Sequence, residues 1–235
     1  MTRRRLTVVA GLTVLAAIAV AAWMARVPIA LVLVERMAER RLGTDAIAAL
    51  PDGLHVGLCG TGSPFPDELR GGPCTFVVAG RRLLVFDAGS GAARSISRMG
   101  FDTGRIDAIL LTHLHSDHLD GLGELMLQRW VGGTRTEPVP VYGPRGVDAV
   151  IDGFALAYGA DRGWRVDHHG AAIVPPTGAG GLARPLDTGA AGRVVLIDEP
   201  DLQVVAFEVD HAPVHPALGY RIRYKDRTVV LSGDT

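Results

Sequence analysis

The sequence has little cysteine, no excess of charge of either sign and no internal repeat. Cys59 and Cys74 are the only cysteines in 235 residues, too few for the disulfide framework of a small secreted domain. We expect two buried thiols, with a single bridge as the alternative for an exported domain. The 24 Lys and Arg residues balance 25 Asp and Glu residues, so composition gives no electrostatic case for nucleic-acid binding. No repeat indicates a solenoid. With 48 % hydrophobic residues, the chain can form one domain with a sizeable core.

An uncharged apolar segment occupies residues 6–24, directly after three arginines at positions 3–5. It is long enough to cross about 30 Å of hydrocarbon as a helix. A cleaved signal peptide is the alternative, because residues 19–21 offer a small-residue cleavage site, but the length favours an uncleaved anchor.

The chain therefore divides into three predicted parts. Residues 1–26 form a membrane anchor or signal, residues 27–53 an amphipathic linker, and residues 54–235 a globular domain. The leading arginines favour a cytoplasmic amino terminus and a globular domain on the periplasmic, extracytoplasmic side. The basic residues from Arg26 onward weaken that bias.

The globular part alternates strand-like and helix-like patterns, which indicates an α/β fold. Residues 170–192 are dominated by Gly, Ala and Pro and predict a long surface loop, with His168 and His169 as solvated residues before it. Strands are expected at 54–59, 74–79, 83–86, 106–111, 139–142, 202–209, 218–224 and 228–232, and helices at 90–99, 119–131 and 144–158.

Three histidines and two carboxylates lie within residues 112–121, directly after the buried strand at 106–111. His113 and His115 are two residues apart, so at a strand end their imidazoles leave one face together and can bind one cation. Asp117 and His118 follow after the chain has turned and can serve a second cation. Imidazole and carboxylate suit zinc, and manganese or iron are also compatible. The alternative is a surface loop with chance histidines, which four potential ligands in six residues disfavour.

The sequence His113-Leu-His-Ser-Asp-His118 resembles the H-x-H-x-D-H signature of the metallo-β-lactamase superfamily of metal-dependent hydrolases. Further motifs at 60–64, 86–89, 219–222 and 232–235 resemble its ribonuclease Z and arylsulfatase-like branch, in the family's order. The resemblance implies an αββα metallo-β-lactamase sandwich, preceded here by an N-terminal transmembrane helix.

The resemblance also implies a two-metal centre, with two zinc ions in a complete domain. His113 and His115 match ligands of the first site, Asp117 and His118 match ligands of the second, and Asp234 matches the carboxylate between the metals. Asp117 is also expected to orient the nucleophile.

The third histidine of the first site is either His211 or His215, and we prefer His211, which directly follows a predicted strand. His215 then lines the pocket as a catalytic residue that steadies an anion or moves a proton.

Two further groups have a functional and a purely structural interpretation. Asp87 can orient a ligand histidine from behind the metal, or cap a helix. The loop formed by Gly60, Thr61, Gly62 and Ser63 can cradle an anionic ester group through its backbone amides, or form a simple tight turn.

The family completes its second site with a histidine beyond the G-D-T motif, whereas this sequence stops at Thr235. We therefore expect a C-terminally incomplete domain that binds about one metal.

The implied reaction is attack by a metal-bound hydroxide on a small ester. A sulfate ester or a phosphodiester is favoured. A lactone or other carboxylic ester is the alternative, as is a catalytically impaired, membrane-tethered metal-binding scaffold. No nucleic acid is expected, because the short hairpin between Tyr220 and Gly233 leaves no room for an RNA-holding arm. The oligomeric state is not indicated.

Overall fold

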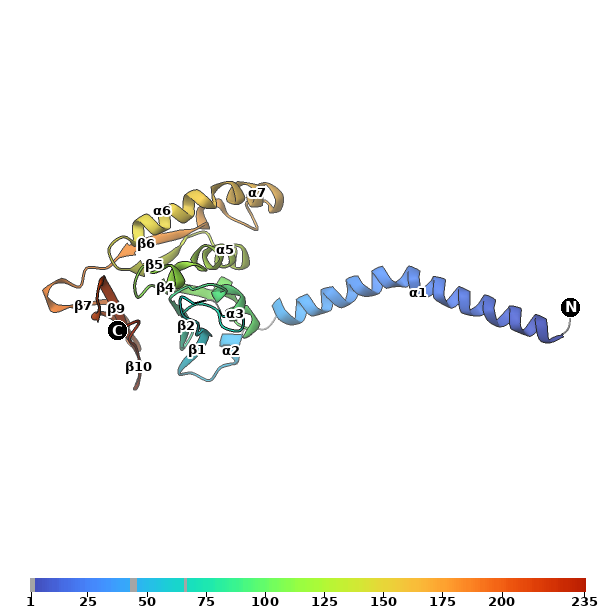
Figure 1. The fold of residues 1–235 in the computed structure, drawn as a ribbon, viewed down its shortest axis with the longest axis horizontal. Coiled ribbons are helices and arrows are strands. Elements are labelled where there is room, and N and C mark those ends of the chain that lie inside the picture. Colours follow the sequence, from blue (N-terminus) through green and yellow to red (C-terminus); the bar gives the residue numbers. More distant parts are fainter. Residues whose placement is uncertain (1–2, 43–45, 66) are drawn as a thin grey trace. The chain divides into compact units, whose positions relative to one another are not determined.

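A computed structural model describes residues 3–42, 46–65 and 67–235 (Figure 1). The chain forms two compact units, divided between Asp45 and Ala46. The first unit contains the single helix α1 (Arg3–Leu42), and the second contains all the strands.

Helix α1 continues well beyond the boundary predicted near residue 26. Within it, Val14–Val34 is long and apolar enough to cross a membrane, judged by length and composition alone. Pro28 lies inside the helix without ending it. A proline inside a helix removes one backbone donor, and here the helix continues on both sides of it. The expected linker therefore starts as part of the apolar helix.

The second unit begins with a short helix, α2 (Ala46–Ala49), which belongs to the globular core. Ile47 has only 2 % of its surface exposed and packs in the same cluster as Phe76 and Ile96. The globular unit thus begins before residue 54, the start predicted from the sequence.

In the described part of the chain, ten strands form two sheets. In the first sheet, neighbours follow chain order; the pairs from β1 to β3 are antiparallel and those from β3 to β6 are parallel. Its strands are β1 (Leu54–Gly60), β2 (Cys74–Ala79), β3 (Arg82–Phe86), β4 (Ile106–Leu110), β5 (Val139–Gly143) and β6 (Gly181–Pro185). The second sheet is antiparallel, in the order β10-β9-β8-β7, with strands β7 (Arg193–Asp198), β8 (Leu202–His211), β9 (Val214–Tyr224) and β10 (Arg227–Leu231).

Helices connect the parallel strands. They are α3 (Ala92–Arg98), α4 (Ser116–Leu119), α5 (Leu122–Gly133), α6 (Val147–Ala157) and α7 (Gly159–His169), with 3₁₀ turns η1 (Thr103–Arg105), η2 (Pro176–Gly178) and η3 (Gly189–Ala191). The apolar residues Leu122, Leu125 and Met126 recur at helical spacing and are buried against the first sheet.

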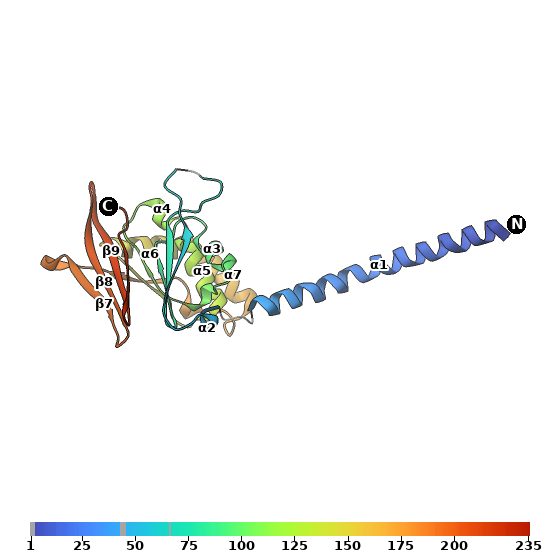
Figure 2. The ribbon, with the colours of Figure 1, turned by 90° about the horizontal axis from the view of Figure 1, so that it is seen from below.

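The globular unit is layered, and Figure 2 shows β7–β9 as a layer separate from the first sheet. One core cluster joins the first sheet to α3, α5 and α6; a second joins that sheet to the other, with Phe86 and Leu110 facing Tyr220 and Ile222. The strands β2 and β3 are therefore apolar on both faces, as a strand buried between two layers must be.

The region predicted as a long loop contains structure that the sequence did not indicate. Strand β6 pairs in parallel with β5, although its sequence Gly-Leu-Ala-Arg-Pro has little β propensity. His168 and His169 lie in the last turn of α7 rather than in a loop. Helix α6 begins at Val147 rather than at Pro144, because Gly146 adopts a positive φ of 100° at its start.

Cys59 and Cys74 form a disulfide, so the expectation of two free thiols is wrong. Gly60 pairs with Cys74 across β1 and β2, which brings the Cα atoms of the two cysteines to 5.0 Å. The bridge closes the base of the loop between these strands.

Candidate metal centre

The centre forms where the strand β4 ends, and two distant parts of the chain, Asp87 and strand β9, hold that strand end in place. The Thr112 amide donates to Asp87 Oδ1 at 2.8 Å, and the Leu218 amide of β9 donates to the Thr112 carbonyl at 2.8 Å. The buried Tyr220 hydroxyl donates to the Leu111 carbonyl at 2.6 Å. The backbone that carries His113 is thus fixed by both sheets before any ligand binds.

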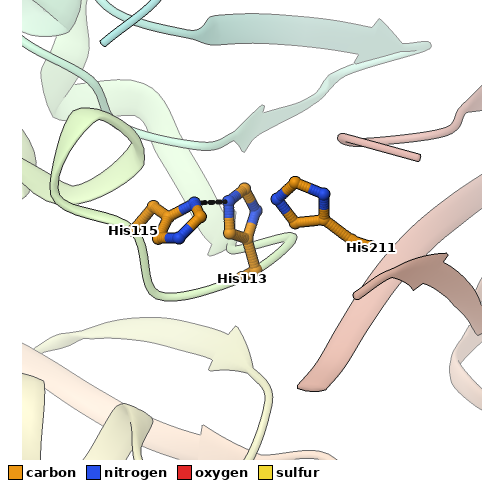
Figure 3. A group of neighbouring side chains, drawn as sticks. All are labelled: His113, His115 and His211. Atoms are coloured by element: carbon orange, nitrogen blue, oxygen red, sulfur yellow. Dashed lines mark hydrogen bonds between the residues drawn. The ribbon is translucent and has the colours of Figure 1, made fainter. Parts of the chain in front are cut away.

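The structure brings together His113, His115 and His211, each with a ligand nitrogen within 4.8 Å of the others (Figure 3). His113 Nε2 and His115 Nδ1 are 2.9 Å apart, and His211 enters from the end of β8. The Nε2 atom of His211 is buried and has no hydrogen-bond partner. A buried polar atom without a partner is costly, so this nitrogen is arranged for a ligand the protein itself does not supply.

A second group shares His113 with the first and adds His118 and Asp234. His118 Nε2 lies 3.7 Å from Asp117 Oδ2 and 3.7 Å from Asp234 Oδ1. The other oxygen of Asp234 lies 4.0 Å from His211 Nε2. One carboxylate therefore faces both groups, the geometry that a bridging ligand between two ions requires.

Asp87 lies behind the second group. It is 6 % exposed, and its Oδ2 lies 2.9 Å from His118 Nδ1, while Thr112 donates to Oδ1. A proton on Nδ1 then points to Asp87 and leaves the His118 Nε2 lone pair facing Asp117 and Asp234. Helix α3 has Gly91 at its N-cap and no side-chain cap, so Asp87 does not act as the helix cap considered from the sequence.

The two buried histidines have pKa values shifted in opposite directions. Burial, followed by the neighbouring charge of His118, lowers the pKa of His113 to about 4, so its imidazole is neutral at pH 7. Burial also lowers the pKa of His118, but the hydrogen bond and charge of Asp87 and the charges of Asp234 and Asp117 outweigh it. The net pKa of His118 is raised. Protons therefore compete with a metal at His118 more than at His113.

The donor set fits divalent cations. It offers four imidazoles and two carboxylates converging from three elements, with the orphaned His211 Nε2 among them. Three imidazole nitrogens with an open position suit zinc, and the second group, which includes a carboxylate, suits zinc, manganese or iron.

In the glycine loop at the end of β1, at least one amide is not free for an anion. Gly62 donates its amide hydrogen to the Gly71 carbonyl at 2.7 Å, so the expected anion cradle of Gly60, Thr61, Gly62 and Ser63 is wrong for Gly62. A Cβ atom on Gly72 would lie 2.7 Å from the Asp117 carbonyl. The end of this loop thus packs directly under the ligand-bearing turn.

His215 does not belong to either ligand group and lies in the wall of a polar pocket of about 280 Å³. This polar pocket is lined by Arg145, Leu186, Asp187, Thr188, Gly189, Glu208, His215, Pro216 and Leu218. Only His215 among them was expected from the sequence, because the others follow β5 and β6 or lie on β8 and β9 and share no motif.

Comparison with known proteins identifies the family. The model of the family described as "Metallo-beta-lactamase superfamily" matches residues 67–235. A protein named "Ribonuclease Z" from Mycolicibacterium gilvum (strain PYR-GCK) is 36 % identical over 184 residues, which cover 77 % of this chain and 62 % of the relative. One of the same name from Mycobacterium sp. (strain KMS) is 38 % identical over 77 % of this chain and 61 % of the relative. The chain spans about three fifths of the length of these relatives.

Solved structures share the fold. The human tRNase Z, short form, matches with a TM-score of 0.57 and 24 % identity, covering 76 % of this chain and 68 % of that one. The metallo-beta-lactamase fold protein YhfI from Bacillus subtilis matches with a TM-score of 0.55 and 19 % identity, covering 79 % of this chain and 64 % of that one.

The expectation that nucleic acid is not a partner is wrong, because relatives at 36 and 38 % identity are named as ribonucleases. The short Lys225-Asp226 turn between β9 and β10 was weak evidence, since an arm can be inserted elsewhere on the same fold. The neutral total charge was also weak evidence, since it does not describe the local field around a site.

Proposed function

Because the chain belongs to the metallo-beta-lactamase superfamily, we propose that it is a metal-dependent hydrolase of phosphodiester bonds with RNA as its substrate. The convergence of six potential ligands on one strand end, with the His211 nitrogen buried and unpartnered, supports hydrolysis. The relatives are named as ribonucleases, which supports a phosphodiester bond of RNA as the substrate. The motifs alone had also favoured a sulfate ester.

We assign His113, His115 and His211 to one ion, Asp117 and His118 to a second, and Asp234 to both. Zinc is the proposed metal, with manganese or iron as alternatives. When bound, such ions lower the pKa of a water to about 7 and stabilise negative charge on phosphate oxygens.

The protein's own residues supply orientation and protons. Asp117, whose carboxylate lies 3.7 Å from His118 Nε2, is assigned to accept a hydrogen bond from the attacking water and to orient it towards phosphorus. Asp87 holds the His118 ring in the required tautomer. His215, in the wall of the polar pocket, donates a proton to the oxygen that leaves phosphorus.

A panel of esters tests the reaction class. The full chain in detergent, stripped and reloaded with zinc, is given bis(p-nitrophenyl) phosphate, p-nitrophenyl sulfate, p-nitrophenyl butyrate, a lactone and an RNA stem with a 3′ extension. We expect kcat/KM for the phosphodiester to exceed that for the other small esters about 100-fold, or about 2.7 kcal/mol in barrier. We also expect chelator-sensitive RNA cleavage. Faster sulfate or carboxylic ester hydrolysis would support those alternatives, and metal binding without turnover would support a scaffold.

We further propose that α1 anchors the protein in a membrane and that the globular unit lies on the oxidising, extracytoplasmic side. The apolar stretch Val14–Val34 supports the anchor by length and composition. The Cys59–Cys74 disulfide supports the extracytoplasmic position of the globular unit, because disulfides persist outside the reducing cytoplasm.

Deleting residues 1–45 should release the protein from membranes, whereas the full chain should resist a carbonate wash. The deletion stops before Ile47, since that side chain is buried in the globular core. Fractionation followed by blotting measures the partition, and alkylation of cells before lysis measures the oxidation of the two cysteines. Release of the full chain from membranes by the carbonate wash, or a mature protein that begins near Ala22, would exclude the membrane anchor. Free Cys59 and Cys74 thiols in cells would exclude the extracytoplasmic position of the globular unit.

A further inference from the structure

The polar pocket lies directly beside the candidate metal centre. On one side, a Cβ atom on Gly146, next to Arg145, would lie 3.2 Å from the Leu114 side chain, between His113 and His115. On the other side, the Leu218 amide donates to the Thr112 carbonyl at 2.8 Å. Both walls therefore flank the segment that carries the first two ligands, at the carboxyl edge of the parallel strands where α/β proteins bind ligands.

Hydrogen bonds hold the walls of the pocket in position without a ligand. Asp187 accepts from the Gly189 amide at 3.0 Å and from Arg145 Nη2 at 3.0 Å. The Thr188 hydroxyl donates to Glu208, whose own amide donates to the Gly192 carbonyl at 2.9 Å. The segment between β6 and β7, which connects the two sheets, is thus hydrogen-bonded to β8. Little conformational entropy of the pocket walls is therefore lost when a ligand binds.

The pocket presents donors and acceptors together. The side chains of Arg145 and Asp187 are 73 % and 71 % exposed, so each keeps unused hydrogen-bonding capacity towards the opening. Glu208 is also exposed, while Leu186 and Leu218 are buried and apolar. The pocket thus offers one guanidinium, two carboxylates and an apolar surface. These groups match a flat heterocycle that carries both hydrogen-bond donors and acceptors on its edge. The volume of about 280 Å³ is near the lower end of about 300–1,000 Å³ for small-ligand sites.

We propose that the polar pocket binds the nucleobase next to the scissile phosphate and prefers guanine. Guanine offers its O6 and N7 acceptors to the fork of Arg145 and its N1 and N2 hydrogens to Asp187 or Glu208. Adenine carries an amino group where guanine carries O6, and pyrimidines lack N7. This assignment rests on the proposed phosphodiesterase activity and adds to it the residues that select the substrate.

Binding and cleavage are measured separately. Binding of the four nucleoside 5′-monophosphates to the full chain is followed by calorimetry. We expect guanosine monophosphate to bind most tightly, and Arg145→Ala and Glu208→Gln each to weaken its binding about tenfold, because each removes hydrogen bonds to the base. Arg145→Lys should weaken it similarly, because a lysine keeps the charge but loses the planar fork. The matched control is Arg162→Ala, an exposed arginine of α7 outside the pocket, which should leave binding unchanged.

For cleavage, the measured quantity is kcat/KM for a guanosine-containing dinucleotide divided by that for bis(p-nitrophenyl) phosphate, which has no base. Arg145→Ala should lower this ratio about tenfold, mainly through KM. Equal binding of all four nucleotides, or unchanged binding and ratio in Arg145→Ala, overturns the base site. If the unmodified chain hydrolyses no diester but still binds guanosine monophosphate selectively, the proposed activity is overturned. The proposal of a base-binding site is then retained.

Discussion

Replacing His211 with alanine is expected to remove most of the metal bound at the centre and to lower phosphodiester kcat/KM on the order of 10³-fold, about 4 kcal/mol. The Nε2 atom of His211 is buried without a hydrogen-bond partner, beside the nitrogens of His113 and His115. Losing even a residue that only supports a ligand costs about 10–100-fold in metal affinity, so losing a ligand should cost more. Elemental analysis after dialysis against the metal measures the content, and competition with a chelator measures the affinity.

The matched variant is His215→Ala. His215 lines the polar pocket and does not belong to either ligand group, so its loss should leave metal content nearly unchanged and lower kcat. His168→Ala, on the last turn of α7, serves as a surface control that should change neither quantity. The reverse result, with metal lost in His215→Ala and kept in His211→Ala, would exchange the roles of the two residues.

Replacing Asp87 with asparagine should weaken the second ion about 10–100-fold while leaving the first largely in place. The carboxylate lies 2.9 Å from His118 Nδ1 and also accepts from the Thr112 amide. An asparagine keeps the size but removes the charge, so the His118 ring loses its orientation and part of its basicity. Titration with zinc, followed by calorimetry, should show the tighter step unchanged and any second step weakened about 10–100-fold relative to the unmodified chain.

The pKa of His118 provides a second readout in the metal-free protein. In the wild type the hydrogen bond and charge of Asp87 raise this pKa against the opposing effect of burial. Removing the charge leaves burial opposed only by Asp234 and Asp117, so the pKa should fall in Asp87→Asn. A titration by NMR measures it. An unchanged pKa together with unchanged metal binding would show that Asp87 stabilises only the backbone at Thr112.

The sequence by itself determined the local parts of the candidate centre. A buried apolar strand followed by His113, His115, Asp117 and His118 fixes four potential ligands at one strand end, because side-chain direction alternates along a strand and the turn follows directly. The same local patterns gave the strands β1 to β5 and the helices α3 and α6 within a few residues, since each is encoded by its own apolar spacing. The family followed from the motifs and was confirmed by the match over residues 67–235.

Only the tertiary structure decided the parts that depend on pairing between distant segments. The disulfide arises from the register of β1 against β2, and β6 exists because β5 offers it a partner, not because of its own sequence. An irregularity between Val209 and His211 shifts the register of β8, and a one-residue shift reverses which face a side chain occupies, so the sequence left His211 and His215 as alternatives. The polar pocket has the same origin. Arg145, Asp187 and Glu208 follow or belong to three different strands, and only the packing of two sheets against each other brings them to one site.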